Sequence, residues 1–245
     1  METRVDEISD GIYRLSTYMA DAGPKGFMYN QFLIDGDEPF LFHTGHRATF
    51  AVVSEAISSV MPLDRLRWIS FGHIESDECG AMNQLLGAAP NAQVVHGRVG
   101  CAVTLNDIAD RPPLALEDGA VLDIGGHRLH HIYTPHVPHG WEACVFHDET
   151  TSTLLCGDLF AQVGASEPTT SGDILGAAFE AEDLFHATCL TPQTAPTVRR
   201  LAGFAPQTLA LMHGPSYKGD GAAALLALAD ELDGRFEAAC AQAAN

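Results

Sequence analysis

The first third of the chain alternates short apolar runs with Gly, Pro, Asp and Asn, a pattern typical of strands separated by turns. Runs of strand length cover residues 11–16, 27–34 and 39–43. Residues 51–60 instead carry apolar side chains at helical spacing, and this segment stops before Pro62, which disfavours helix in the residue that precedes it. The pattern predicts a meander of strands covered by one helix.

The remainder of the chain repeats this order of strands and then helices. Further strand-like runs cover residues 67–71, 94–96, 120–124, 128–133, 144–147, 153–156 and 208–212. Helical patterns cover residues 78–86, 99–108, 179–187, 195–202 and 221–241. Residues 164–172, rich in Ser, Thr, Gly and Pro, are expected to form a linker. Strands followed by helices, twice over, predict an α/β four-layer αββα sandwich in a single domain spanning residues 1–245.

The densest group of chemically active side chains follows the apolar run 67–71. In the motif His73-Ile-Glu75-Ser-Asp77 the three polar residues occupy every second position, so in extended backbone they would share one face. Three potential ligands on one face at a strand end favour a metal site. The alternative is an ordinary polar loop, because such loops are rich in acidic residues.

Three further candidate ligands, His139, Asp158 and His213, each lie where an apolar run ends at a turn. Six of the twelve histidines fall between positions 127 and 147, so His136 is a rival for His139. The additional candidates shift the balance from a polar loop towards a metal centre.

The order of these residues along the chain resembles that of the metal ligands in the metallo-β-lactamase superfamily. Within that superfamily it resembles the di-iron core of flavodiiron proteins and the related oxygen-binding di-iron proteins. The shared pattern is H-x-E-x-D, followed at long intervals by His, Asp and His, and the resemblance covers nearly the whole chain. The metal ligands that it implies are His73, Glu75 and His139 for a first iron, Asp77 and His213 for a second, and Asp158 as a bridge.

Glu75 separates this chain from the zinc hydrolases of that superfamily, which usually have a neutral imidazole at this position. Three carboxylates in the ligand set favour iron, with manganese as an alternative, because hard oxygen ligands suit these ions better than zinc. Zinc has no redox chemistry. Redox chemistry with dioxygen or peroxide as the bound ligand is therefore expected over hydrolysis, with two iron ions as cofactor and zinc the less favoured metal.

Three residues near the predicted ligands have open roles. Glu78 stands where hydrolytic members and many flavodiiron proteins have a histidine; it could ligate the second metal or belong to the first turn of a helix, where acidic side chains are favoured. His43 and His136 could support the ligands through hydrogen bonds or be ordinary turn residues. No catalytic residue beyond the metal ligands and no organic cofactor site is expected.

The charge balance excludes some classes of partner. Thirteen basic residues against thirty-two acidic ones give a formal net charge of −19, which disfavours nucleic acid and anionic membrane surfaces. The N-terminus has no basic, apolar leader, and no uninterrupted apolar stretch reaches the roughly 18 residues of a membrane span. A cytoplasmic location is expected. The six cysteines show no paired spacing typical of a metal or redox site, and most are expected to be buried.

Because the sequence continues only briefly past His213, no flavodoxin-like domain is expected, and no Gly-rich phosphate motif offers a flavin site. The leading hypothesis is therefore an oxygen-binding di-iron sensor or carrier, reporting to a signalling protein. One alternative is a di-iron oxygen or nitric oxide reductase that uses an external redox partner. Another is a metal-dependent hydrolase of the same fold. A homodimer is expected from the relatives that the chain resembles.

Overall fold

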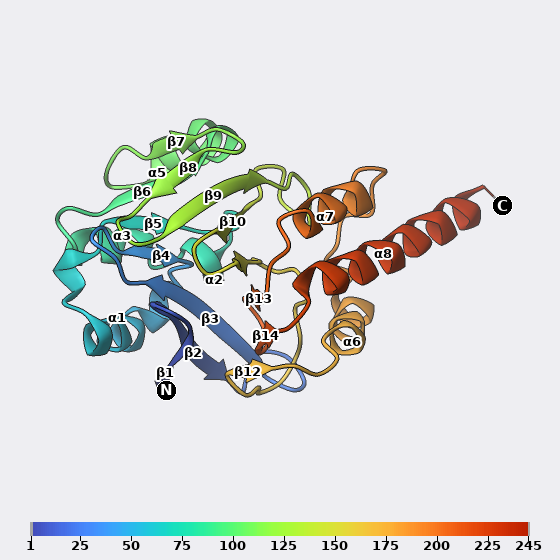
Figure 1. Ribbon diagram of the computed structural model, residues 1–245, viewed down its shortest axis with the longest axis horizontal. Coiled ribbons are helices and arrows are strands. Elements are labelled where there is room, and N and C mark those ends of the chain that lie inside the picture. The colour runs from blue at the N-terminus through green and yellow to red at the C-terminus, as the bar shows by residue number, and fades with distance from the viewer. Residues whose placement is uncertain (1, 245) are drawn as a thin grey trace.

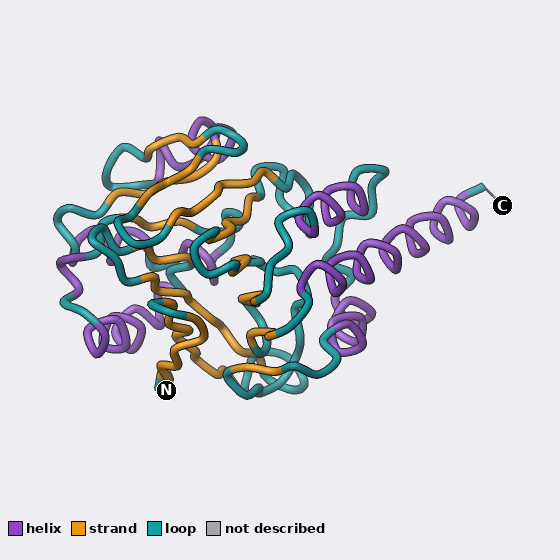
Figure 2. Tube along the Cα trace, in the orientation of Figure 1, coloured by secondary structure: helices purple, strands orange, loops and turns teal. Residues whose placement is uncertain are grey.

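Three groups of buried apolar side chains lie between the layers of the fold. Figure 1 shows the arrangement of the strands and helices that form these layers. The computed structural model describes residues 2–244. One group, which includes Phe32, Phe42 and Phe146, fills the space between two seven-stranded sheets. The second lies under helices of the N-terminal half, and the third under helices of the C-terminal half. The predicted αββα sandwich is confirmed, with helices outside the strands (Figure 2).

The first sheet is an antiparallel meander that continues into parallel strands. Its strands are adjacent in chain order, and the pairing changes from antiparallel to parallel at β4. They are β1 (Thr3–Ser9), β2 (Ile12–Met19), β3 (Phe27–Ile34), β4 (Phe40–Phe42), β5 (Trp68–Ser70), β6 (Gln93–Gly97) and β7 (Leu114–Leu116).

The second sheet has the strand order β12-β14-β13-β11-β10-β9-β8, and its central pair, β11 and β13, is parallel. Its strands are β8 (Val121–Asp123), β9 (Arg128–Tyr133), β10 (Cys144–Asp148), β11 (Thr153–Leu155), β12 (Thr169–Thr170), β13 (Thr208–Ala210) and β14 (Ser216–Lys218). Because β4, β5, β11 and β13 all run in parallel pairs, the loops at their carboxyl ends can carry ligands at one edge of the sandwich.

The helices form where the apolar spacing predicts them. Helix α1 (Phe50–Val60) buries Val53, Ala56 and Ile57 against the first sheet. Helix α8 (Gly221–Ala243) is capped at its N-terminus by Asp220, whose side chain accepts a hydrogen bond from the Ala223 N–H. The remaining helices are α2 (Ser76–Cys79), α3 (Met82–Ala88), α4 (Arg98–Gly100), η3 (Cys101–Leu105), α5 (Asn106–Ile108), α6 (Leu175–Phe185) and α7 (Thr194–Ala202), with single turns η1 (Arg47–Thr49) and η2 (Leu63–Arg65).

Two expectations about local structure were wrong. The helix expected over residues 78–86 is two helices, α2 and α3. The segment 164–172 is not a simple linker, because it contains β12, which pairs with β14 at the edge of the second sheet. The short strands β12 and β14 and the polar strand β1 were also not predicted, since their pairing with neighbours rather than an apolar pattern makes them strands.

Within residues 2–244, no helix is both long and apolar enough to cross a bilayer.

Candidate metal centre

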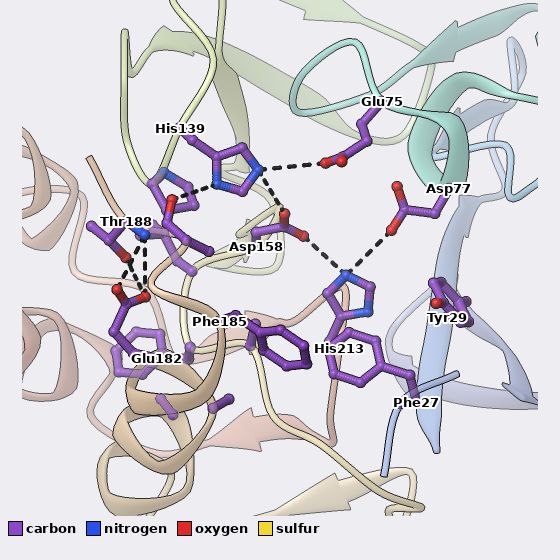
Figure 3. Close-up of a pocket in the computed structure, with 18 of the residues that line it drawn as sticks. Phe27, Tyr29, Glu75, Asp77, His139, Asp158, Glu182, Phe185, Thr188 and His213 are labelled. Atoms are coloured by element: carbon purple, nitrogen blue, oxygen red, sulfur yellow. Dashed lines mark hydrogen bonds and ion pairs between the residues drawn. The ribbon is translucent and has the colours of Figure 1, made fainter. Parts of the chain in front are cut away.

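The candidate ligands meet at the carboxyl ends of the central strands. The loop after β5 carries two of them, α2 carries one, and the loops after β9, β11 and β13 carry one each. Figure 3 shows five of these side chains pointing toward one another in the lining of a pocket. The residues are His73, Glu75, Asp77, His139, Asp158 and His213.

The structure has the predicted extended backbone in only part of the H-x-E-x-D motif. Glu75 has extended backbone, but α2 begins at Ser76, so Asp77 lies in a helical turn rather than in the same extended strand. Asp77 still reaches the cluster, because the start of α2 turns its side chain toward His213. The structure brings Asp77 near the cluster through a helical turn and not through the strand alternation that was expected.

Four side chains form the tighter part of the cluster. His73, Glu75, His139 and Asp158 each offer a ligand atom, and these atoms all lie within 4.8 Å of one another. His73 Nε2 is 2.8 Å from Glu75 Oε2 and 2.9 Å from His139 Nε2. Asp158 Oδ2 lies 3.4 Å from His139 Nε2. Two imidazole nitrogens so close together, among carboxylate oxygens, match the donor set of a transition-metal site.

A second, looser part of the cluster adjoins the first through Asp158. His213 Nε2 lies 3.2 Å from Asp158 Oδ1 and 3.5 Å from Asp77 Oδ2. Asp158 thus presents one oxygen to each part of the cluster. Asp77 Oδ1 and Asp158 Oδ1 are buried and make no well-aligned hydrogen bond, as expected of oxygens placed to bind a cation.

The outer nitrogens of two rings are fixed by backbone carbonyls. His139 Nδ1 is 3.1 Å from the carbonyl oxygen of Ala187, and His213 Nδ1 is 2.7 Å from that of Met28. Because a carbonyl can only accept, Nδ1 must carry the hydrogen in both rings, and the lone pair of a neutral ring is then on Nε2. Both Nε2 atoms face the cluster, which is how histidines are held in metal sites.

The charges of the cluster are strongly coupled. Burial disfavours a charged His73 ring, but Glu78 and Glu75 outweigh it and raise its pKa to about 12. Burial also opposes charge on His213, yet Asp158 raises the pKa of that ring to about 10. Hydrogen bonds from His139 and His73 lower the pKa of Glu75. The carboxylates that favour protonated rings here would equally favour a metal cation in their place.

The cluster forms one end of a pocket of about 640 Å³ whose other walls are largely apolar. The ring centroid of Phe27 lies 4.4 Å from that of His213 and 5.7 Å from that of Phe185 (Figure 3). Tyr29 stands edge-on to His213 at 5.3 Å, and burial raises its pKa. The contribution of Phe27 and Phe185 was not predicted, since an apolar residue near a strand end or on a helix could equally pack in the core.

The three residues whose roles the sequence left open, Glu78, His43 and His136, differ in burial and in their distance from the cluster. Glu78 and His43 are buried beneath His73, and their facing atoms, Glu78 Oε1 and His43 Nε2, lie 3.3 Å apart. His136 is exposed in the turn that precedes His139. Of the two rivals, His139 is therefore the one that the fold brings to the cluster.

Two mixed sheets with flanking helices, and a cluster of His, Glu and Asp at their strand ends, define a metallo-β-lactamase-like fold with a candidate metal centre. The chain belongs to the ODP family of β-lactamase-like proteins, whose model matches residues 27–214. The predicted relation to the cores of flavodiiron proteins is confirmed.

Similar proteins include Putative diflavin flavoprotein A 1 from Nostoc sp., which is 27% identical over 198 residues, covering 78% of this chain and 34% of that protein. Rubredoxin-oxygen oxidoreductase from Megalodesulfovibrio gigas is 22% identical, covering 80% of this chain and 50% of that protein. The metal-soaked Flv1 flavodiiron core from Synechocystis sp. superposes with a TM-score of 0.80 at 20% identity, covering 94% of this chain and 60% of that chain. The chain thus spans a third to a half of these curated relatives.

Proposed function

We propose that this protein binds two iron ions and uses them to engage dioxygen as an oxygen sensor or carrier. The observation that carries the proposal is the convergence of imidazole Nε2 atoms and carboxylate oxygens, with Asp158 directed to both parts of the cluster. In this proposal the first ion is held by His73, Glu75 and His139, the second by Asp77 and His213, and both by Asp158.

The chain's own residues would prepare the site for a small ligand. The Ala187 and Met28 carbonyls fix two rings in the tautomer that leaves Nε2 free. Phe27 and Phe185 limit the water beside His213. A pair of ferrous ions supplies electrons for dioxygen, whereas zinc cannot.

The names of relatives support oxygen chemistry without deciding its form. One is named as a rubredoxin-oxygen oxidoreductase, and solved relatives are named as flavodiiron or flavo di-iron proteins. The oxidoreductase favours a second candidate function, reduction of dioxygen or nitric oxide with electrons from an external donor. A hydrolase remains the third alternative, and a homodimer, a signalling partner and a cytoplasmic location stay predictions.

Metal analysis and oxygen uptake test the proposal. Protein prepared without air from iron-replete cells should contain two iron ions per chain and take up about one dioxygen per pair when air is admitted, with a new visible absorption band. Protein that holds two zinc ions and stays colourless would contradict the proposal.

Steady-state kinetics separate the three candidate functions. A sensor or carrier should take up dioxygen once and then stop, even with reduced rubredoxin or a reduced flavoprotein present. Continuous consumption of dioxygen or nitric oxide with these donors would establish the reductase instead. Turnover of thioesters, lactones or phosphoesters that is lost in Asp158→Ala would establish the hydrolase.

A further inference from the structure

Glu78 is a completely buried carboxylate directly behind the candidate metal centre. Its backbone carbonyl accepts hydrogen bonds from the Thr44 N–H and hydroxyl, which fix α2 to the loop that follows β4. Its side chain faces His73: Oε2 accepts a 2.7 Å hydrogen bond from the His73 N–H, and Oε1, which makes no well-aligned hydrogen bond, lies 3.3 Å from His73 Nδ1. The carboxylate therefore faces the side of His73 opposite to the clustered Nε2 atom.

The surroundings of Glu78 keep its carboxylate in this position. Oε1 also lies 3.3 Å from His43 Nε2, and His43 is itself fully buried, with Nδ1 3.2 Å from the carbonyl oxygen of Asn30. A Cβ atom at Gly72 would lie 3.2 Å from both carboxylate oxygens, so the glycine leaves the space that they occupy. Turning the side chain toward Asp77 would break the contacts with His73 and His43 and leave the charge unpaired in the interior, which is costly.

The two parts of the cluster consequently offer different numbers of ligands. The first part has His73, Glu75, His139 and Asp158. The second has Asp77, Asp158 and His213, and Glu78, the residue next to Asp77, is directed elsewhere. Near the second part, Phe27 and Tyr29 pack against His213, and His46, which lines the same pocket, packs 4.8 Å from the ring of Tyr29 and forms no ion pair with Asp77 or Asp158 among the described residues.

We propose that Glu78 is a positioning residue that holds His73 for the first metal ion, and that the second metal position is consequently one protein ligand short. The inference rests on the proposed two-metal function. A carboxylate at Nδ1 fixes the ring orientation and strengthens Nε2 as a ligand, so the first ion is bound tightly. The second ion, with three protein ligands, would be bound more weakly.

Stepwise metal binding tests this asymmetry. The metal-free protein is titrated with Co²⁺ without air, with calorimetry and the cobalt absorption bands as readouts. The wild-type protein should show two separate steps. In Glu78→Gln, which keeps the side-chain size, the tighter step should weaken by about 10- to 100-fold, so that the two steps move closer together.

The direction of the change distinguishes the two roles of Glu78. If Glu78 were a ligand of the second ion, Glu78→Gln would weaken the weaker step and move the two steps further apart. That result, or unchanged steps, would overturn the inference. Glu142→Gln is the matched control, because Glu142 Oε1 accepts a hydrogen bond from the Ile74 N–H in the same loop. It should leave the separation of the steps unchanged.

A spectroscopic readout covers the case in which Glu78→Gln folds poorly. In wild-type protein loaded with Zn²⁺ and labelled with ¹⁵N-histidine, the His73 Nδ1–H resonance should be shifted downfield relative to that of His139, because its acceptor is a carboxylate rather than a carbonyl. A His73 ring bound through Nδ1 would overturn the inference. Protein that binds no divalent ion at all would instead overturn the proposed function.

Discussion

The histidines of the candidate metal centre lie in loops beyond strand ends, whereas His127, His130, His131 and His147 lie in or beside the paired strands β9 and β10. The second group is closer together in sequence, yet it forms no metal cluster among the residues that the structure describes. Density of histidine in the sequence is thus a poor guide to a metal site.

The strand geometry explains the difference. His130 and His147 are cross-strand partners on one face of the sheet, while the neighbouring His131 points to the other face, where its ring packs 5.1 Å from that of Phe146. Because successive residues in a strand alternate between faces, neighbouring histidines are separated into different layers. Loops have no such constraint and can bring His73, His139 and His213 together.

His147 and His213, one histidine from each group, have opposite electrostatics. Burial lowers the pKa of His147 to about 4, and neither of its ring nitrogens has a hydrogen-bond partner. In the metal centre, burial is outweighed by carboxylates, which raise the pKa of His213 to about 10. In the β9–β10 group, His127 and His130 pair with separate carboxylates, Asp148 and Glu149. In the metal centre, one carboxylate, Asp158, faces both His139 and His213.

The largest effect should come from the carboxylate that both parts of the cluster share. Asp158→Asn keeps the shape of the side chain but removes its charge, so both ions should be lost, with affinities lower by more than about 100-fold. Metal content after gel filtration measures this. His147→Leu is the control from the other group of histidines, and it should retain two ions. Retention of both ions in Asp158→Asn would contradict the role of a shared ligand.

Replacing one histidine of the cluster should have a smaller, local effect. His213→Gln removes the only imidazole proposed for the second ion, so one ion per chain should remain. In the same metal analysis, His139→Gln should weaken the first ion instead. Equal loss of both ions in both variants would indicate that the two positions do not bind metal separately.

His147 should affect stability rather than metal binding. Its pKa of about 4 in the folded protein lies below the value of about 6.5 expected after unfolding, so the unfolded chain binds the proton first. The stability that depends on a neutral His147 is fully present above about pH 6.5. The free energy of unfolding should therefore decrease by up to roughly 3 kcal/mol as pH falls from about 6.5 to 4.

Urea unfolding of metal-free protein at pH 7 and pH 5 measures this dependence, since chelation removes any contribution from metal release. His147→Leu should lose less stability than the wild type between these two values. Equal losses would show that His147 is accessible to protons in the folded protein.

The smallest effect is expected at His130, on the surface of the same pair of strands. Its ring pairs with Glu149, which is partly exposed, and solvent screens such a pair. His130→Gln should therefore leave both the metal content and the unfolding transition unchanged. A loss of metal in this variant would mean that the histidines of β9 and β10 support the cluster after all.

Local patterns in the sequence predicted many of the strands and helices of this fold. The runs at 27–34 and 128–133 coincide with β3 and β9, and the helical spacing at 195–202 predicts α7 to within one residue. Edge strands such as β12 escaped prediction, because two residues carry no periodic pattern and only their pairing with β14 makes them a strand.

For the site, the sequence by itself determined which side chains are available: the H-x-E-x-D motif and the later His, Asp and His at the ends of apolar runs. Only the tertiary structure decided which of their atoms face one another. The Ala187 and Met28 carbonyls that orient His139 and His213 come from distant segments, and Glu78 turns toward His73 because of the space at Gly72. Side-chain direction depends on packing between segments far apart in the chain, and residue spacing alone cannot specify it.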